Sequence, residues 1–398
     1  MKPPIDTSAS SVVEYPSAIF SLERHEIYPY DRFAYNLLHV ATEALHKKGL
    51  PQRIFLSFLE GTADNTWWFF NASIDRLDGN SEGSNGFHIS STPLTPILLF
   101  SICHTMGYAM FDEHEDQSRA VEPEIISKKL RSVGDALSNA TLIYREKGLA
   151  SAIRSITESL GIGVFNIERA TTYYDVCTQY LTNHEIAHAY VGQLSKNTRR
   201  FSDSERHAFE FIVDLIATEW IYNKMIVNTP DTAEYRNIRG TKSHAESILS
   251  NALLVCQSQL LIFLTMAFAG ALLNRGKVIL DGGDVHPNSL IRHMMMDVHF
   301  WTLFESNYST LLSVDQLKEL NDYTHSFFGV FAHAGLFSID DTKAFTHKSN
   351  LEDYENAQSL ISEFKIKELE HRGGIFTIAK DFHSQMTSED GATLVKVD

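Results

Sequence analysis

Two histidines and a glutamate in this chain stand at a spacing that suits a metal ion. His184, Glu185 and His188 form the pattern H-E-x-x-H within HEIAH. Residues four apart on a helix lie on the same face, so both imidazoles can bind one ion at about 2.0–2.1 Å. Glu185 lies too far round the helix to join them and can instead act as general base toward an attacking water. On an exposed face the same histidines would be solvated and inert, so the prediction of a metal site requires a further ligand.

Two carboxylates on the next predicted helix supply that ligand. Glu210 and, one turn later, Asp214 stand in the almost continuous apolar run AFEFIVDLIATEW. A catalytic zinc site has three protein ligands and one open position, and we predict Glu210 as the third ligand. Asp214 is placed to accept the free N–H of a ligating histidine, which would fix its tautomer. A cation would also offset the cost of burying these charges. His207, nearer the helix start, is the second choice for third ligand.

Zinc suits a set of two histidines and one glutamate best, and we predict one zinc ion per chain. The ion would polarise a scissile carbonyl and activate water, with Glu185 carrying the proton to the leaving amine. This chemistry predicts hydrolysis of peptide bonds in a protein or peptide substrate.

A later segment, HPNSLIR, offers further catalytic groups. His286 could donate a hydrogen bond to the oxyanion, and Arg292 could hold the surroundings of His286 or contact substrate. The alternative is a plain helix N-terminus, with Arg292 on a solvated face. Tyr190 and Tyr222 are alternative hydroxyl donors.

The pattern of the chain predicts an α+β fold with a small sheet early and a helical body after it. The apolar and aromatic runs within about 53–91 predict strands, and those of 170–191 predict the helix that carries HEIAH. The next helix begins near Ser202, which forms a capping box with Glu205. This order is that of zinc peptidases of the zincin type. The predicted strands are Arg53–Leu59, Trp67–Ile74 and Gly86–Ser90.

The predicted domain boundaries follow from proline and from polarity. Residues 1–30 contain four prolines and predict an irregular arm, followed by a helix over 31–48 with Asp31 as its N-cap. The catalytic domain is predicted over 31–335. Residues 336–398 are predicted to be a helical extension with a polar tail.

The composition excludes some partners and leaves one localisation open. A net charge of −16 disfavours nucleic acid, since phosphate binding requires clustered lysine and arginine. Three distant cysteines and a polar N-terminus without a signal sequence favour the cytoplasm. The apolar segment Ala252–Leu273 is interrupted by Gln257, Ser258 and Gln259, which favours a buried core helix, although membrane association is the alternative.

The motifs HEIAH, EFIVD and HPNSLIR, in this order, resemble those of gluzincin metallopeptidases, and most closely the Lit-type peptidases of phage exclusion. The resemblance covers about residues 53–292 and implies a zincin-like fold. It implies His184, His188 and Glu210 as zinc ligands, Glu185 as catalytic acid and base, and Asp214 beside the ligands. It also implies roles for the later histidine and arginine named above.

Two other functions stay open from the sequence. Membrane-bound gluzincins related to prenyl-protein peptidases are the nearest alternative, built around the apolar segment 252–273. The other is a non-catalytic zinc-binding module, which would need a closed site with four protein ligands, His207 being the fourth.

Overall fold

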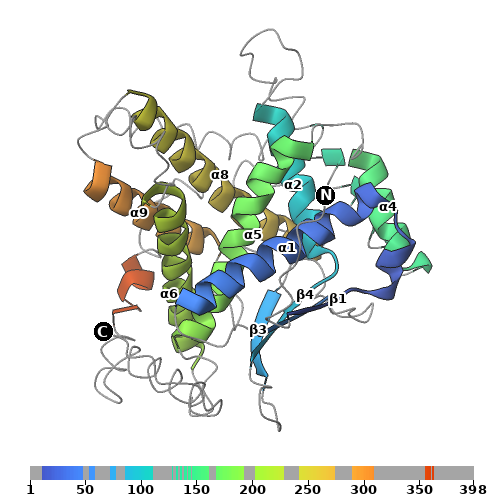
Figure 1. The fold of residues 1–398 in the computed structure, drawn as a ribbon, viewed down its shortest axis with the longest axis horizontal. Coiled ribbons are helices and arrows are strands. Elements are labelled where there is room, and N and C mark those ends of the chain that lie inside the picture. The colour runs from blue at the N-terminus through green and yellow to red at the C-terminus, as the bar shows by residue number, and fades with distance from the viewer. Residues whose placement is uncertain are drawn as a thin grey trace.

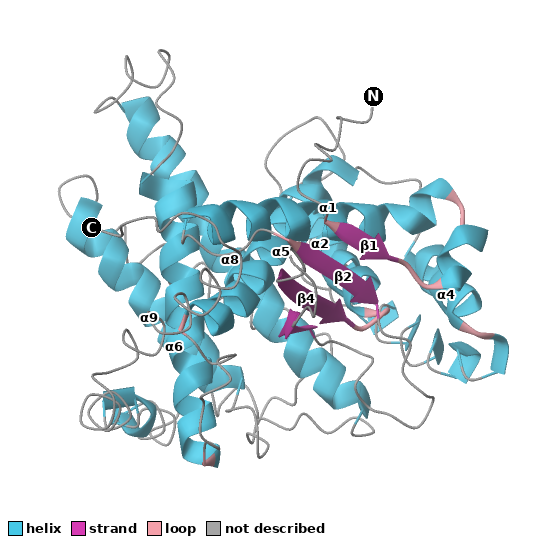
Figure 2. Ribbon diagram, turned by 60° about the horizontal axis from the view of Figure 1, so that its bottom comes forward, coloured by secondary structure: helices cyan, strands magenta, loops and turns pink. Residues whose placement is uncertain are grey.

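The protein, described by a computed structural model, is mostly helical with one four-stranded sheet, as the predicted α+β class requires (Figure 1). The structure describes residues 11–47, 53–58, 72–77, 86–110, 148–160, 167–191, 202–227, 242–273 and 289–308, with short pieces within 128–147 and 355–362. The sheet lies against one side of the helical body in both ribbon views (Figures 1 and 2). Most of the predicted C-terminal extension, 336–398, is outside the described residues.

The sheet has the order β1-β2-β4-β3 and mixes parallel and antiparallel pairs. β1 runs parallel to β2, β2 runs parallel to β4, and β3 pairs with β4 in the antiparallel sense. Alternate side chains of β2 and β4 face the core, because successive strand residues point to opposite faces. Gly86 begins β4 where a Cβ would stand 2.5 Å from the carbonyl oxygen of Arg53, so the close approach of the two strands requires glycine. The strands are β1 (Val12–Glu14), β2 (Ile54–Phe58), β3 (Ala72–Leu77) and β4 (Gly86–Ser91).

Two predicted strands agree with the sheet, and the described part of the third overlaps it and ends later than predicted. β2 and β4 match the predicted runs to within one residue at each end. The aromatic run 67–74 overlaps β3 only at its last three residues, and β3 continues through the polar residues Asp75 and Arg76. Residues 59–71 lie outside the described part of the chain.

The first helix begins earlier than predicted, and the predicted irregular arm is wrong for residues 12–30. These residues form β1, the 3₁₀ turn η1 (Ser17–Ser21) and the start of α1 (Arg24–Lys47). Asp31 is therefore inside α1 and does not cap it. The backbone N–H of Glu23 donates to the Glu26 carboxylate at 2.7 Å, which satisfies one of the amides at the helix start.

Tertiary packing allows α1 to continue through Pro29, the residue that suggested an irregular arm. The Tyr174 hydroxyl donates to the Pro29 carbonyl at 2.8 Å, and that of Tyr30 donates to the Pro93 carbonyl at 2.7 Å. Tyr30 and Phe33 are fully buried. Burial of these two rings outweighs the one helical hydrogen bond that proline cannot donate.

Helix α5 (Ile167–Tyr190) is the centre of the helical body, because it contacts the helices on all sides. Its neighbours are α1, α2 (Thr95–Met110), α6 (Asp203–Tyr222) and α8 (Lys242–Leu273). α6 continues into a π-helical turn, η3 (Asn223–Val227), and packs against α9 (Ser289–Tyr308). The amphipathic α4 (Leu149–Leu160) contacts η1, α1 and α2.

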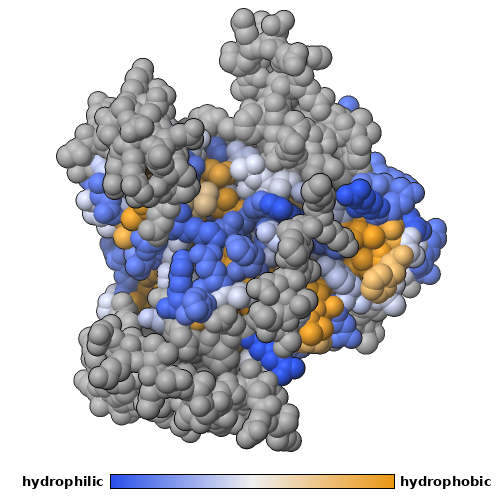
Figure 3. Space-filling view, viewed as in Figure 1, coloured by the Kyte–Doolittle hydropathy of each residue, from blue (hydrophilic) through white to orange (hydrophobic). Residues whose placement is uncertain are grey.

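The apolar helix α8 is the one described segment whose length and composition would allow it to cross a membrane. Its window Ser247–Met266 has a mean hydropathy of 1.7, yet 72% of that window is buried inside the protein. Gln257, Ser258 and Gln259 are buried there, and the Gln259 amide donates to Thr218 on α6 at 3.2 Å. In Figure 3, the described residues of the visible face are largely hydrophilic, with separate apolar patches. These features favour a core helix.

Candidate metal centre

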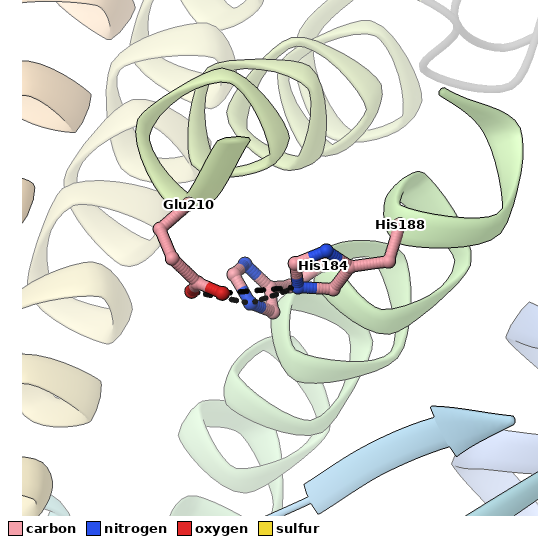
Figure 4. A group of neighbouring side chains, drawn as sticks. All are labelled: His184, His188 and Glu210. Atoms are coloured by element: carbon pink, nitrogen blue, oxygen red, sulfur yellow. Dashed lines mark hydrogen bonds and ion pairs between the residues drawn. The ribbon is translucent and has the colours of Figure 1, made fainter. Parts of the chain in front are cut away.

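Two adjacent helices position the predicted metal ligands. α5 presents His184 and His188 one turn apart, near its C-terminal end. α6 begins at the predicted capping box, which is confirmed: the Glu205 N–H donates to Ser202 Oγ, and the Glu205 carboxylate accepts from the Ser202 N–H at 2.8 Å. The cap fixes where α6 starts. Glu210 lies in the second turn of this helix and points toward the two histidines of α5 (Figure 4).

The structure brings together His184, His188 and Glu210, all three buried. The two Nε2 atoms are 3.1 Å apart. Glu210 Oε2 lies 3.5 Å from Nε2 of His184, and Oε1 lies 3.6 Å from Nε2 of His188 (Figure 4). Tetrahedral ligands at about 2.0–2.1 Å from an ion are roughly 3.4 Å from one another. The three side chains therefore lie close enough together to hold one ion, with one ligand atom from each within 4.8 Å of the others.

Asp214 lies behind His184, on the side away from the converging nitrogens. Its Oδ1 is 2.9 Å from His184 Nδ1, so the imidazole can donate from Nδ1 and keep Nε2 free for a cation. The carboxylate is fully buried, and three different side chains surround it: His184, Tyr180 and Arg292. Such contacts fix the tautomer and the rotation of the ring.

Arg292 forms a buried two-pronged ion pair with Asp214. Its Nε donates to Oδ2 at 2.6 Å and its Nη2 donates to Oδ1 at 2.9 Å. Nη2 also lies 3.5 Å from Glu210 Oε2. The alternative of a solvated Arg292 is therefore wrong, and the predicted role of Arg292 toward His286 stays a prediction. Its guanidinium supports the two carboxylates, while His286 itself is outside the described residues.

The pKa values of His184 and Asp214 depend on each other and on their charged neighbours. Burial disfavours the charged form of Asp214, but Arg292 and His184 outweigh it and lower the Asp214 pKa to about 2. Burial likewise opposes protonation of His184, yet hydrogen bonds and charges from Asp214 and Glu210 raise its pKa to about 10. Before a cation binds, a proton on His184 thus compensates the nearby carboxylates.

Other sequence-predicted groups lie elsewhere or stand outside the cluster. His207 is half-buried and is not a member of the three-residue group, in which Glu210 takes the third place. The Tyr190 ring packs edge-on against Trp220, with centroids 5.7 Å apart. The Tyr222 hydroxyl donates to the carbonyl of Leu303 on α9 at 3.1 Å, so it serves packing.

Sequence reasoning missed Tyr180, whose hydroxyl donates to Asp214 Oδ1 at 2.9 Å. Tyr180 stands one turn before His184, so tyrosine and both histidines follow one another at helical spacing on α5. That spacing is the signal that could have found it.

No family model, curated protein or solved structure matches this chain. The resemblance to gluzincins therefore rests on the three motifs, and function has to be argued from the geometry of the cluster.

Proposed function

We propose that the protein is a zinc-dependent endopeptidase of the gluzincin type, with His184, His188 and Glu210 as ligands. The observation that carries the proposal is that both Nε2 atoms and the Glu210 carboxylate converge, with one ligand atom per residue within 4.8 Å of the others, and an ion held by three protein ligands keeps a position for water or substrate. A purely structural zinc site would close that position with a fourth protein ligand. Within the described residues, the cluster holds three.

The buried charges support a bound cation. The buried acids of α5 and α6 are Glu185, Glu210 and Asp214, and the buried cation that contacts two of them is Arg292. Glu210 and Asp214 both contact the guanidinium of Arg292, so with neutral imidazoles these three groups carry a net charge of −1. Buried charge is costly, which favours a cation between Glu210 and the two imidazoles.

In the proposed reaction, the protein's own groups orient and move protons. A bound zinc ion would supply Lewis acidity, polarising the scissile carbonyl and lowering the pKa of water toward about 7. Glu185, buried beside the first ligand, accepts the proton of the attacking water and returns it to the leaving amine. Asp214 holds His184 in the tautomer that leaves Nε2 free.

The sheet offers a place for an extended substrate. β3 is the terminal strand of the order β1-β2-β4-β3, and it contacts α5. An extended peptide can add to such an edge through backbone hydrogen bonds, which favours substrates with an unfolded segment of several residues. We propose that an exposed segment of an intracellular protein is bound in this way, and a role in phage defence is consistent with the motif resemblance.

The test uses the full chain, zinc analysis and a quenched-fluorescence peptide library. We expect one zinc per purified chain and cleavage of a subset of the library. Glu185→Gln should keep zinc but lose cleavage by at least about 10²-fold, since it removes the general base. His188→Ala should lose zinc and cleavage together, and His207→Ala is the matched control that should keep both.

Three results would contradict the proposal. Cleavage by Glu185→Gln at the wild-type rate would remove the mechanism, and loss of zinc from His207→Ala would move the ligand set and favour a closed, non-catalytic site. Full zinc occupancy in His188→Ala would exclude the proposed ligands altogether.

A further inference from the structure

The described buried tyrosines differ in what their hydroxyl groups contact. Tyr30 and Tyr174 donate to backbone carbonyls, and Tyr173 donates to the Gln257 side chain at 2.7 Å. Tyr180 instead donates to a carboxylate, that of Asp214, at 2.9 Å, and it is 3% exposed. A hydrogen bond to an ionised acceptor is about twice as strong as one between neutral groups. Tyr180 is thus the described buried tyrosine whose hydroxyl bears directly on the candidate metal centre.

Several neighbours hold the carboxylate of Asp214. Oδ1 accepts from the Tyr180 hydroxyl and from Arg292 Nη2, each at 2.9 Å, and Oδ2 accepts from Arg292 Nε at 2.6 Å. Oδ1 also lies at ion-pair distance, 2.9 Å, from His184 Nδ1. The two hydrogen bonds on Oδ1 occupy both lone pairs of that oxygen. The contacts come from α5 on one side and α9 on the other, which restricts rotation of the carboxylate.

Met296 Sδ on α9 also lies beside the Tyr180 hydroxyl, but a thioether is only a weak acceptor. Thr218 is a further hydrogen-bonding neighbour of this hydroxyl. Among these groups, the ionised carboxylate of Asp214 is the strongest acceptor for the hydroxyl hydrogen. A phenylalanine would fill nearly the same volume without this bond, so the hydroxyl contributes orientation of Asp214 more than it contributes packing.

We propose that Tyr180 is a positioning residue of the metal centre, which holds Asp214 in the rotation that orients His184 toward the ion. This inference rests on the proposed zinc site and extends it to a residue outside the H-E-x-x-H motif. Without the hydroxyl, Asp214 keeps its pair with Arg292 but turns more freely about it, and His184 loses its fixed orientation. Metal affinity and ligand geometry then change while the fold is retained.

The experiment compares Tyr180→Phe with Tyr174→Phe in the full chain. Tyr174 is a matched control, because it is fully buried on the same helix and its hydroxyl donates to a backbone carbonyl on α1. Zinc affinity is measured by competition with a chromophoric chelator, and ligand geometry by the visible absorption of the Co²⁺-substituted protein. We expect Tyr180→Phe to bind zinc about 10–100-fold more weakly and to shift the cobalt bands. Tyr174→Phe should leave the zinc affinity within about twofold of wild type, as expected of a residue without a link to the ligands.

The outcomes separate this inference from the proposed function. Zinc binding by wild type together with unchanged affinity and an unchanged cobalt spectrum in Tyr180→Phe would overturn the role of Tyr180 and leave the zinc site standing. Equal losses in both tyrosine variants would also overturn it, since they would reflect general loosening of α5. A wild-type protein that binds neither zinc nor cobalt would overturn both proposals.

Discussion

Replacing Arg292 with methionine tests whether the buried charges of the centre are arranged as the structure indicates. The side chains of Arg292 and Asp214 are 9% and 1% exposed, and two hydrogen bonds of 2.6 and 2.9 Å join them. Methionine retains much of the apolar stem but leaves Asp214 without its cationic partner. Removal of one member of a buried pair costs about 3–5 kcal/mol, because the remaining charge stays buried and uncompensated.

A second arginine–aspartate pair supplies the control. Arg32 on α1 donates to Asp175 on α5 from Nε at 2.7 Å, but these side chains are 34% and 21% exposed. Solvent screens a pair of this kind, so Arg32→Met should cost about 1 kcal/mol or less. Each variant removes a two-pronged contact between two helices, α1 and α5 for Arg32 and α9 and α6 for Arg292. The difference between their losses of unfolding free energy therefore measures the effect of burial.

The assay is urea unfolding followed by far-UV circular dichroism, with chelator present and then with zinc in excess. With chelator, Arg292→Met should lose about 3–5 kcal/mol of unfolding free energy. Zinc should restore part of this loss, because a ligand that binds only the folded state stabilises it and the divalent charge compensates the same carboxylates. A loss of about 1 kcal/mol or less for Arg292→Met, equal to that of Arg32→Met, would refute this account of the buried charge.

Three further predictions concern the pH dependence of zinc affinity, the pH dependence of stability, and the start of α6. His184 must lose its proton to bind zinc, and its pKa is raised to about 10, because contacts with Asp214 and Glu210 outweigh burial. Zinc affinity should therefore rise about tenfold per pH unit from about pH 7 to 9 in chelator competition, and a flat profile would contradict the pairing. By the same linkage, the chelated protein gains stability from His184 that is complete below its unfolded pKa and is lost as pH rises through about 10. Ser202→Ala should lower the unfolding free energy in urea by about 0.5–2 kcal/mol, and no change would mean that the cap is not formed in solution.

The parts of the fold that the sequence predicts well depend on local signals. The sequence predicts a helix over 170–191, and α5 is Ile167–Tyr190. α6 begins at the capping box that the spacing of Ser202 and Glu205 predicts. Periodicity and capping act within one or two turns, so one sequence suffices to see them. The start of α1 was missed for the opposite reason. Pro29 is a strong local signal, but hydrogen bonds and burial from distant segments outweigh it.

The residues of the candidate site likewise fall into two groups, those predicted by local spacing and those placed by tertiary packing. The spacing of His184 and His188 is a property of one helix, whereas the partners of Asp214 come from two other helices, α5 and α9. Arg292 is 78 positions away from Asp214 along the chain. Spacing alone could not decide between a solvated arginine and a buried one, because that choice depends on how α9 packs against α6.

The buried charge explains why this division matters for function. The H-E-x-x-H motif predicts where an ion would bind, but the strength of binding depends on how many charges around it remain uncompensated. With Arg292 buried against Asp214, that aspartate is paired, and the Glu210 carboxylate is the charge that faces the two imidazoles. The place of this charge is thus a property of the packed helices and not of the H-E-x-x-H motif alone.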